Sequence, residues 1–186
     1  MMWVRMISAN LTREELARRL RVSEKKMRLL QKLVYEDALT GLGNRRYFDA
    51  AFGDELALAE RQGIKLSVFV IDVNGLKRIN DTKGHKFGDR LIRKTANAIK
   101  ATVRRGDLAF RYGGDEFVIL AFTKGRTGAG SLSRRLAGAM ESRGISAAIG
   151  SAGIWEASGS SAARRLFRLA DKRMYDRKLK MKKGAA

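Results

Sequence analysis

Acidic residues follow two apolar segments of the chain, in positions where carboxylates can hold a divalent metal. Asp72 ends the apolar run that begins at Leu66, and Asp115 and Glu116 stand in a turn further along. Mg²⁺ prefers carboxylate oxygens, usually only one or two, and completes its octahedron with water and substrate phosphates. Ligands commonly bind beyond the carboxyl ends of strands in α/β folds. We therefore expect the three carboxylates to converge on a metal site for nucleotide chemistry. The alternative is that each acid caps a turn.

Gly113 and Gly114 stand directly before the second group of acids. Glycine adopts backbone angles closed to other residues and lets a ligand approach the main chain closely. By itself a Gly-Gly pair predicts only a turn. The Gly-rich segment KGRTGAGS at 124–131 lacks the Lys-Ser/Thr pair of a phosphate-binding loop, so we predict a flexible loop there.

Alternating helices and strands must position these residues after Asp37. Apolar residues recur at helical spacing in the segments 48–59, 91–103, 131–143 and 166–174. Strand-like runs occupy the segments 66–71, 108–111, 117–122 and 145–155. The second and third of these runs flank the turn that carries the acids, which predicts a hairpin. The pattern predicts an α/β (α+β) fold with a mixed central sheet flanked by helices.

The residues before Asp37 contain an amphipathic leader helix. Thr12 and Glu15 predict a capping box, and an apolar stripe at steps of four and three follows, made of Leu16, Leu20, Met27, Leu30 and Val34. About three heptads fit, as in a short coiled coil, and packing on its own domain is the alternative. A helix-turn-helix with its turn at Val22 and Ser23 is less favoured. Arg21 stands where such a turn prefers glycine, and no third helix completes the module.

Composition narrows the class of protein and of partner. The 186 residues suffice for one domain with an appendage, and the absence of cysteine excludes disulfides and thiolate metal sites. A net charge of +20 predicts attraction to polyanions such as nucleotides, without indicating a specific nucleic acid. The longest apolar stretch is far below the roughly 20 residues that span a bilayer. The first ten residues lack a signal-peptide pattern, and we expect a cytoplasmic location.

Three sequence blocks occur in order, DALTGLGNRR, IDVNGLKRINDTKGHKFGD and RYGGDEF. Together they resemble the GGDEF family of diguanylate cyclases, over residues 37–178. The resemblance implies a fold similar to the palm of nucleotide cyclases and polymerases, a Mg²⁺ or Mn²⁺ cofactor, and the condensation of two GTP into cyclic di-GMP at a homodimer interface. The expected organisation is a leader helix over 1–36, a cyclase domain over 37–178 and a basic tail over 179–186.

The resemblance also implies roles for individual residues. Asp72 and Asp115 would hold the metal, assisted by the backbone carbonyl of Val73. Asp115 and Glu116 would be the catalytic acids. The metal would activate the attacking hydroxyl and neutralise developing charge, although the residue that takes the hydroxyl proton is left open.

The implied guanine contacts are Asn80 and Asp89. A carboxylate at Asp89 can accept from the ring N–H and the amino group of guanine, donors that adenine does not present in the same arrangement. The resemblance completes the GTP-binding set with four more residues, Gly113, Gly114, Lys178 and Lys182.

The chain departs from the family pattern at three positions. Lys182 stands where an arginine is usual, so a point charge replaces a fork of donors. Asn74 replaces a common Asp and Gly75 a common Phe in the loop after Asp72. These departures bear on turnover rate rather than on reaction type. A weakly catalytic domain that senses GTP or cyclic di-GMP is the alternative, against which the intact RYGGDEF argues.

The string RRGD places Arg104 and Asp107 at the family's spacing for an inhibitory product site. The resemblance implies that they hold a guanine and a phosphate of cyclic di-GMP, with Arg134 or Arg135 as a candidate second arginine. The alternative is a surface ion pair near a helix end.

Two further polar residues are expected to be structural. His85 is the single histidine and therefore a tempting general base, but it lies in the GHKFGD turn, where the family uses it structurally. Asn44 stands at the start of a predicted helix and is expected to cap it.

Overall fold

A computed structural model describes residues 12–159 and 161–183 of the protein. The chain divides into two compact units, one up to Glu36 and the other from Asp37 onward. The expectation of no signal peptide in the first ten residues, and the end of the predicted basic tail, lie outside the described residues. In the described part of the chain, no helix is long and apolar enough to cross a membrane.

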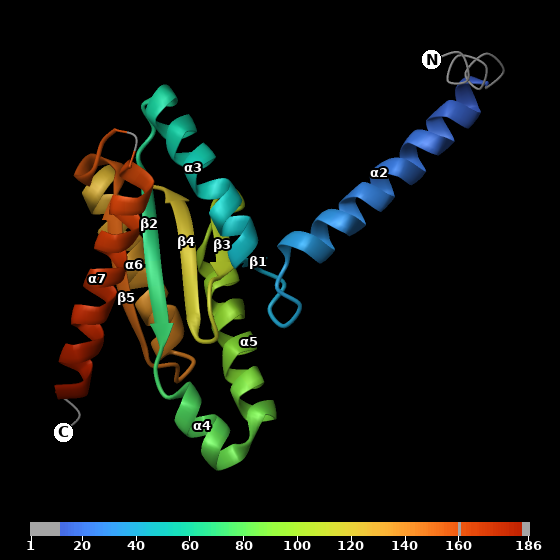
Figure 1. The fold of residues 1–186 in the computed structure, drawn as a ribbon. Helices are drawn as coiled ribbons and strands as arrows, with labels where there is room; N and C mark the ends of the chain where they lie inside the picture. Colours follow the sequence, from blue (N-terminus) through green and yellow to red (C-terminus); the bar gives the residue numbers. More distant parts are fainter. Residues whose placement is uncertain (1–11, 160, 184–186) are drawn as a thin grey trace. The chain divides into compact units, whose positions relative to one another are not determined.

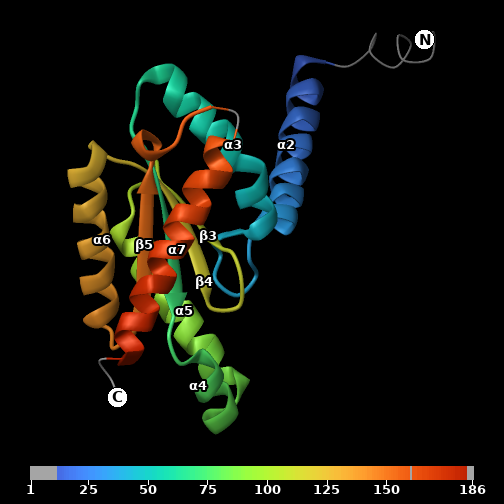
Figure 2. The same ribbon diagram turned by 60° about the vertical axis from the view of Figure 1, so that its left-hand side comes forward.

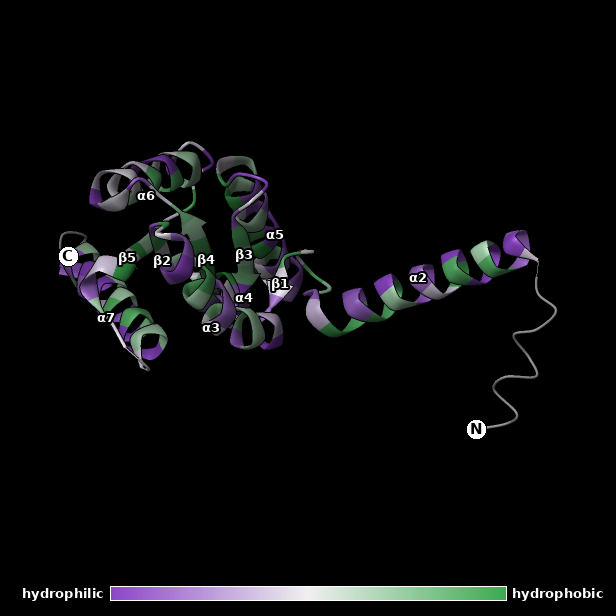
Figure 3. Ribbon diagram, turned by 90° about the horizontal axis from the view of Figure 1, so that it is seen from above, coloured by the Kyte–Doolittle hydropathy of each residue, from purple (hydrophilic) through white to green (hydrophobic). Residues whose placement is uncertain are grey.

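The first unit contains one helix, α2 (Arg13–Tyr35). The predicted capping box is present, because Glu15 N–H donates to Thr12 Oγ1 at 3.2 Å and Thr12 N–H donates to Glu15 Oε2 at 3.0 Å. The helix continues through Val22 and Ser23, so the helix-turn-helix is not formed. None of its residues is buried, and hydrophobic and hydrophilic residues alternate along it (Figure 3).

The second unit is built on a five-stranded sheet in the order β1-β3-β4-β2-β5. Its strands are β1 (Gly43–Asn44), β2 (Leu66–Val73), β3 (Leu108–Arg111), β4 (Glu116–Phe122) and β5 (Ala147–Gly153). β1 pairs with β3 in parallel, and the other pairs are antiparallel. The mixed sheet and the predicted β3–β4 hairpin are therefore confirmed.

Helices cover both faces of this sheet (Figures 1 and 2). One face is covered by α3 (Arg45–Gln62) and α7 (Ala162–Lys183), and the other by α5 (His85–Thr102) and α6 (Gly125–Glu141). The short helix α4 (Leu76–Lys83) lies beyond the end of β2 and contacts α5, and a 3₁₀ turn occupies Ile154–Glu156. The apolar residues of α5 and α6 share a core with Phe69 and Ile71 of β2, and those of α3 and α7 share one with Val68 and Val70. Burial on both faces explains the continuous apolar run of β2.

The segment 124–131 is not the flexible loop that its glycines predicted. It forms the N-terminal turns of α6, which begins at Gly125, whose φ is +65°. The helix buries a stripe of side chains four and three residues apart, made of Ala129, Leu132, Leu136 and Met140. Burial of this stripe outweighs the low helix propensity of glycine.

Candidate functional site

Asp72 is a buried carboxylate near the end of β2, with 6% of its surface exposed. Its Oδ2 accepts a hydrogen bond from Lys178 Nζ of α7 at 2.6 Å. Its Oδ1 is buried and, among the described residues, has no hydrogen-bond partner. An unpaired acceptor in the interior of a protein lowers stability, so a buried oxygen of this kind usually binds a cation or accepts a hydrogen bond.

The pairing of β2 with β4 brings the acids of the turn to this position. Asp72 lies opposite Glu116 in the antiparallel ladder. Beyond the ladder, Val73 N–H donates to the backbone carbonyl of Asp115 at 3.0 Å. The four residues assigned to metal binding and catalysis by sequence resemblance therefore lie together, at one end of two adjacent strands.

The two glycines of the turn do not require special backbone angles, and only Gly113 is in a place where a side chain would lack space. Neither Gly113 nor Gly114 has φ in the left-handed region, contrary to the expectation that they supply special backbone angles. A Cβ on Gly113 would collide with Glu116 Oε2. Gly114 accepts two hydrogen bonds on its carbonyl, both from Arg111.

Burial raises the pKa of Glu116, and the nearby carboxylates of Asp115, Asp72 and Asp171 raise it further, whereas Lys178 lowers it. The raised pKa means that this carboxylate holds a proton more readily than an exposed one. A group of this kind is suited to proton transfer.

A cavity of about 420 Å³ opens beside the acids. Its walls are formed by the end of β2, the start of α4, the turn, and α7, through Val73, Asn74, Gly75, Leu76, Lys77, Asp115, Ser146, Lys178, Met181 and Lys182. Three of these residues are lysines, so the cavity combines a carboxylate with a surplus of positive charge. This combination suits phosphate oxygens together with a divalent cation.

The donor set fits Mg²⁺, which needs only one or two protein carboxylates. Asp72 Oδ1 has no partner among the described residues, and Val73 and Asp115, the other two residues proposed to hold the metal, line the cavity. Across residues 12–159 and 161–183, no cluster of three or more Asp, Glu, His or Cys side chains is arranged to hold a metal. The expected convergence of the three carboxylates on a metal stays a prediction, with Asp72 opposite Glu116 in the ladder and Asp115 directly before Glu116 in the chain.

Asn80 and Asp89 lie on α4 and α5, which meet at Gly84. Asn80 Oδ1 is buried without a partner among the described residues, and a Cβ on Gly88 would collide with it. Asp89 is the next residue and is half-buried. Neither lines the cavity, but Lys77 does and lies on the same short helix as Asn80. The structure thus places the two guanine candidates on one helix pair, whose first helix contributes Leu76 and Lys77 to the cavity.

The loop after β2 explains one departure from the family pattern. Gly75 has φ of +81°, in the left-handed region that favours glycine, and caps the start of α4. A Phe at this position would be strained in the same backbone conformation. Both Asn74 and Gly75 line the cavity.

Arg104 and Asp107 line a second cavity, of about 290 Å³, together with Arg135 and the start of α6. Arg135, not Arg134, is therefore the arginine brought to this site. Both oxygens of Asp107 accept backbone hydrogen bonds, from Arg104 N–H at 2.9 Å and from Phe122 N–H at 3.3 Å. The ion pairs within the described residues do not include Arg104 with Asp107.

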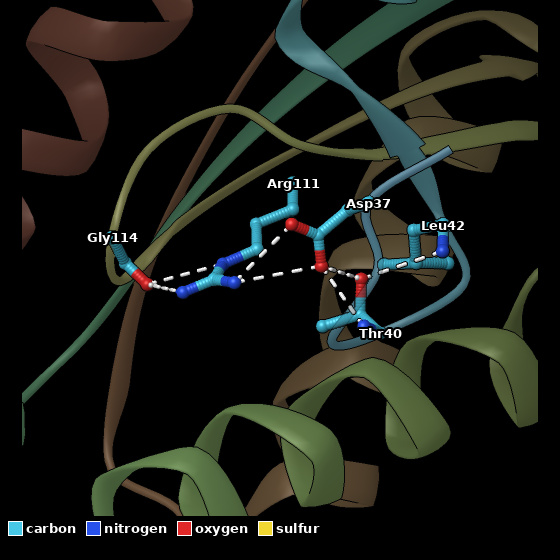
Figure 4. Close-up of polar contacts among 5 residues, drawn as sticks. All are labelled: Asp37, Thr40, Leu42, Arg111 and Gly114. Atoms are coloured by element: carbon cyan, nitrogen blue, oxygen red, sulfur yellow. Dashed lines mark hydrogen bonds and ion pairs between the residues drawn. The ribbon is translucent and has the colours of Figure 1, made fainter. Parts of the chain in front are cut away.

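Figure 4 shows a contact that the sequence analysis missed. Arg111 Nη1 forms an ion pair with Asp37 Oδ2 at 3.2 Å, and Arg111 Nη2 donates to the Gly114 carbonyl at 2.9 Å. Asp37 Oδ1 accepts from the backbone N–H and the hydroxyl of Thr40, at 2.9 and 2.6 Å. One guanidinium thus connects the beginning of the domain to the turn that carries Asp115 and Glu116, the proposed catalytic turn. Asp37 belongs to the block DALTGLGNRR and Arg111 to the block RYGGDEF. Their presence in these blocks was the only indication in the sequence that they have a role.

The remaining polar candidates occupy helix starts. Asn44 caps α3 as predicted, because its Oδ1 accepts from Tyr47 N–H at 3.0 Å. His85 is the exposed first residue of α5 and does not line the cavity. Its location gives no support to a general-base role.

Comparison with known proteins agrees with this geometry. The family model "Diguanylate cyclase, GGDEF domain" matches residues 34–184. Diguanylate cyclase DgcS of Shewanella oneidensis is 38% identical over 149 residues, covering 76% of this chain and 49% of DgcS. A structure of a microbial GGDEF domain with cyclic di-GMP is 31% identical, with a TM-score of 0.71 over 81% of this chain and 94% of that one. The coiled coil and GGDEF domain of DgcB from Caulobacter crescentus, solved with c-di-GMP, shares the fold, with a TM-score of 0.75 at 22% identity over 87% of this chain and 90% of that one.

This chain belongs to the GGDEF domain family of diguanylate cyclases. It spans about half the length of DgcS, 49%, and a smaller share, 18%, of the relative DosC from Escherichia coli.

The raised pKa of Glu116 predicts a pH-dependent effect on stability. The folded protein binds the Glu116 proton more tightly than the unfolded chain does, because ionisation of Glu116 is disfavoured in the fold. The stabilisation of the fold that results is fully present below the unfolded pKa of about 4.5 and is lost as pH rises through the folded pKa. Glu116→Gln should therefore unfold at higher denaturant concentration than wild type near pH 7, and the two should converge below about pH 4.5. Denaturation in EDTA measures this, since a bound cation would offset the repulsion. A pH-independent difference would contradict the assignment.

Proposed function

We propose that the chain is a diguanylate cyclase, which condenses two GTP molecules into cyclic di-GMP and releases two pyrophosphates. The cavity beside the catalytic turn is the observation that carries this proposal. Its lining combines the carboxylate of Asp115 with the positive charge of Lys77 and Lys182, and with Lys178, which pairs with the buried Asp72 behind it. A triphosphate with a divalent cation matches both signs of charge.

In the proposed reaction, the 3′-hydroxyl of one GTP attacks the α-phosphorus of the other, and pyrophosphate leaves. Lys178 and Lys182 hold the triphosphate and stabilise the charge that develops on the leaving group. Asp72 and Asp115, with the Val73 carbonyl, would hold Mg²⁺ or Mn²⁺, which supplies Lewis-acid activation of the hydroxyl when bound. Lys178 also neutralises Asp72, so it links the phosphate contacts to the buried carboxylate.

Guanine is proposed to bind at the pair of helices α4 and α5. Asn80 Oδ1 is an unpartnered acceptor there among the described residues, and Asp89 offers a carboxylate one residue beyond Gly88. Both accept from the N–H donors of guanine. A ligand without those donors would leave buried acceptors unpaired, which is how such a site discriminates between bases.

The reaction requires two subunits, because each binds one GTP and the two substrates must face each other. We propose that α2 helps to pair them. Its apolar stripe is solvent-exposed, with Leu16 and Leu20 each 60% exposed and Met27 and Leu30 each 56%. A stripe at steps of four and three is buried when two such helices form a coiled coil.

The second cavity is proposed to bind cyclic di-GMP as an inhibitor. Arg104 and Arg135 supply positive charge for a phosphate, and Asp107 is held in place by two backbone N–H groups. The cavity is separate from the catalytic one, with which it shares no lining residue. Inhibition from this cavity would therefore be noncompetitive with GTP.

The first test is product identification. The purified chain incubated with GTP and Mg²⁺ should produce cyclic di-GMP and pyrophosphate, measured by chromatography and mass spectrometry. Asp115→Ala should lose synthesis by at least about a hundredfold, because it removes a metal ligand and transition-state stabilisation, while thermal unfolding stays near wild type. Wild-type turnover in this variant would refute the metal assignment. Tight GTP binding by the unaltered chain without product would instead identify a sensor.

The second test concerns assembly. Activity per subunit should rise with protein concentration, because two half-sites must meet. Deleting residues 1–35 should move this rise to higher concentration, and sedimentation under the same conditions should show weaker dimerisation. Constant specific activity across the monomer–dimer transition would exclude a shared site. An unchanged profile after the deletion would exclude only the leader helix as a pairing element.

The third test concerns the inhibitory cavity. As cyclic di-GMP accumulates, its synthesis should slow well before GTP is exhausted. In Arg104→Ala the rate should stay constant for longer, with little change in the initial rate. Coupling of about 1 to 3 kcal/mol corresponds to roughly 5- to 150-fold, which such curves resolve. Arg134→Ala is the matched control, because Arg134 does not line the cavity. Calorimetry showing unaltered affinity of Arg104→Ala for cyclic di-GMP would reject the site.

A further inference from the structure

Ser146 contributes a hydroxyl to the wall of the catalytic cavity. It directly precedes β5, is solvent-exposed, and lines the cavity together with Asp115, Lys178 and Lys182. No role follows for it from the sequence blocks, because it lies outside all of them. Asn74, one of the departures from the family pattern, also lines the cavity and forms a hydrogen bond with Ser146.

Asn74 holds Ser146 through both main chain and side chain. Asn74 N–H donates to the Ser146 carbonyl at 2.8 Å, which joins the loop after β2 to the segment before β5. The side-chain Nδ2 of Asn74 donates to Ser146 Oγ at 3.0 Å and also lies 3.9 Å from Met181 Sδ. Because the thioether sulfur can only accept, its position supports an amide nitrogen, rather than the amide oxygen, facing both neighbours.

This arrangement determines what the serine hydroxyl can do. A hydroxyl has one O–H donor and two acceptor lone pairs, and the amide group of Asn74 uses a lone pair. The O–H of Ser146 therefore remains available to donate. An aspartate at position 74 would instead accept a hydrogen bond from that O–H group and place a negative charge beside the cavity.

We propose that Ser146 Oγ–H donates a hydrogen bond to a phosphate oxygen of the bound GTP, in the pyrophosphate part held by Lys178 and Lys182, and that Asn74 is its positioning residue. The inference rests on the proposed function, since it names a further contact to the same substrate. It also gives the Asn74 departure a physical meaning, because the amide preserves a donor that a carboxylate would consume. A hydrogen bond to a charged acceptor is among the stronger polar contacts.

The experiment compares Ser146→Ala with Ser146→Thr, which keeps the hydroxyl, and with Ser142→Ala. Ser142 is a matched control because it caps the end of α6 and does not line the cavity. Calorimetry with Mg²⁺ should show that Ser146→Ala weakens both GTP and inorganic pyrophosphate by about tenfold or more. KM for GTP should rise with kcat nearly unchanged, which is the pattern of lost uniform binding. Ser146→Thr and Ser142→Ala should stay close to wild type.

Asn74→Asp tests the positioning role. It should weaken pyrophosphate binding about as much as Ser146→Ala, and adding Ser146→Ala to it should cost little more, because the hydroxyl is already engaged. Fully additive losses would refute the coupling. A Ser146→Ala protein with wild-type affinity for pyrophosphate would overturn the inference, even if GTP binding weakened. Failure of the unaltered chain to bind GTP would overturn the proposed function instead, so the two failures are distinguishable.

Discussion

The antiparallel pairing of β2 with β4 is the constraint on which the geometry of the site depends. It sets Asp72 opposite Glu116 and lets Val73 donate to the Asp115 carbonyl. A slip of one residue would turn Asp72 to the other face of the sheet, away from Lys178. Such a slip is resisted because β2 is buried on both faces, by Val68 and Val70 on one side and by Phe69 and Ile71 on the other. Hydrophobic burial thus fixes the position of a carboxylate.

The same register creates an acidic centre in a strongly basic chain. The net charge is +20, yet Glu116 has three carboxylates near enough to raise its pKa and one lysine that lowers it. The lysines stand around the cavity rather than among the acids, with Lys178 as the exception that pairs with Asp72. The groups proposed to bind the cation and those proposed to bind the phosphates are therefore adjacent, as a metal–triphosphate complex requires.

Much of the fold followed from the periodicity of apolar residues. The β3–β4 hairpin, the buried strand β2 and the capped start of α3 at Asn44 were predicted from local patterns. The start of α6 was predicted wrongly, because its glycines suggest a loop and only packing against the sheet makes them helical. Local sequence carries no information about that packing.

The site shows the same division between local and non-local information. The residues of the quoted blocks, such as Asp72 and Asp115, were identified from their order in the chain, and the structure brings them together. The bonds from Arg111 to Asp37 and from Asn74 to Ser146 were missed because each joins residues more than seventy positions apart. The sequence around Arg111 does not indicate Asp37 as its partner, and the sequence around Asn74 does not indicate Ser146. Only the folded sheet, which places the segments side by side, reveals these pairs.

The ion pair of Arg111 has a practical consequence for transplanting the catalytic domain to other proteins. A fusion that begins at Gly43, where the first strand starts, would discard Asp37 and leave the guanidinium bound only to the Gly114 carbonyl. The discarded turn also contains Thr40, whose carbonyl accepts from Lys100 Nζ of α5 at 2.7 Å. The smallest portable unit therefore begins at Asp37, six residues ahead of the first strand.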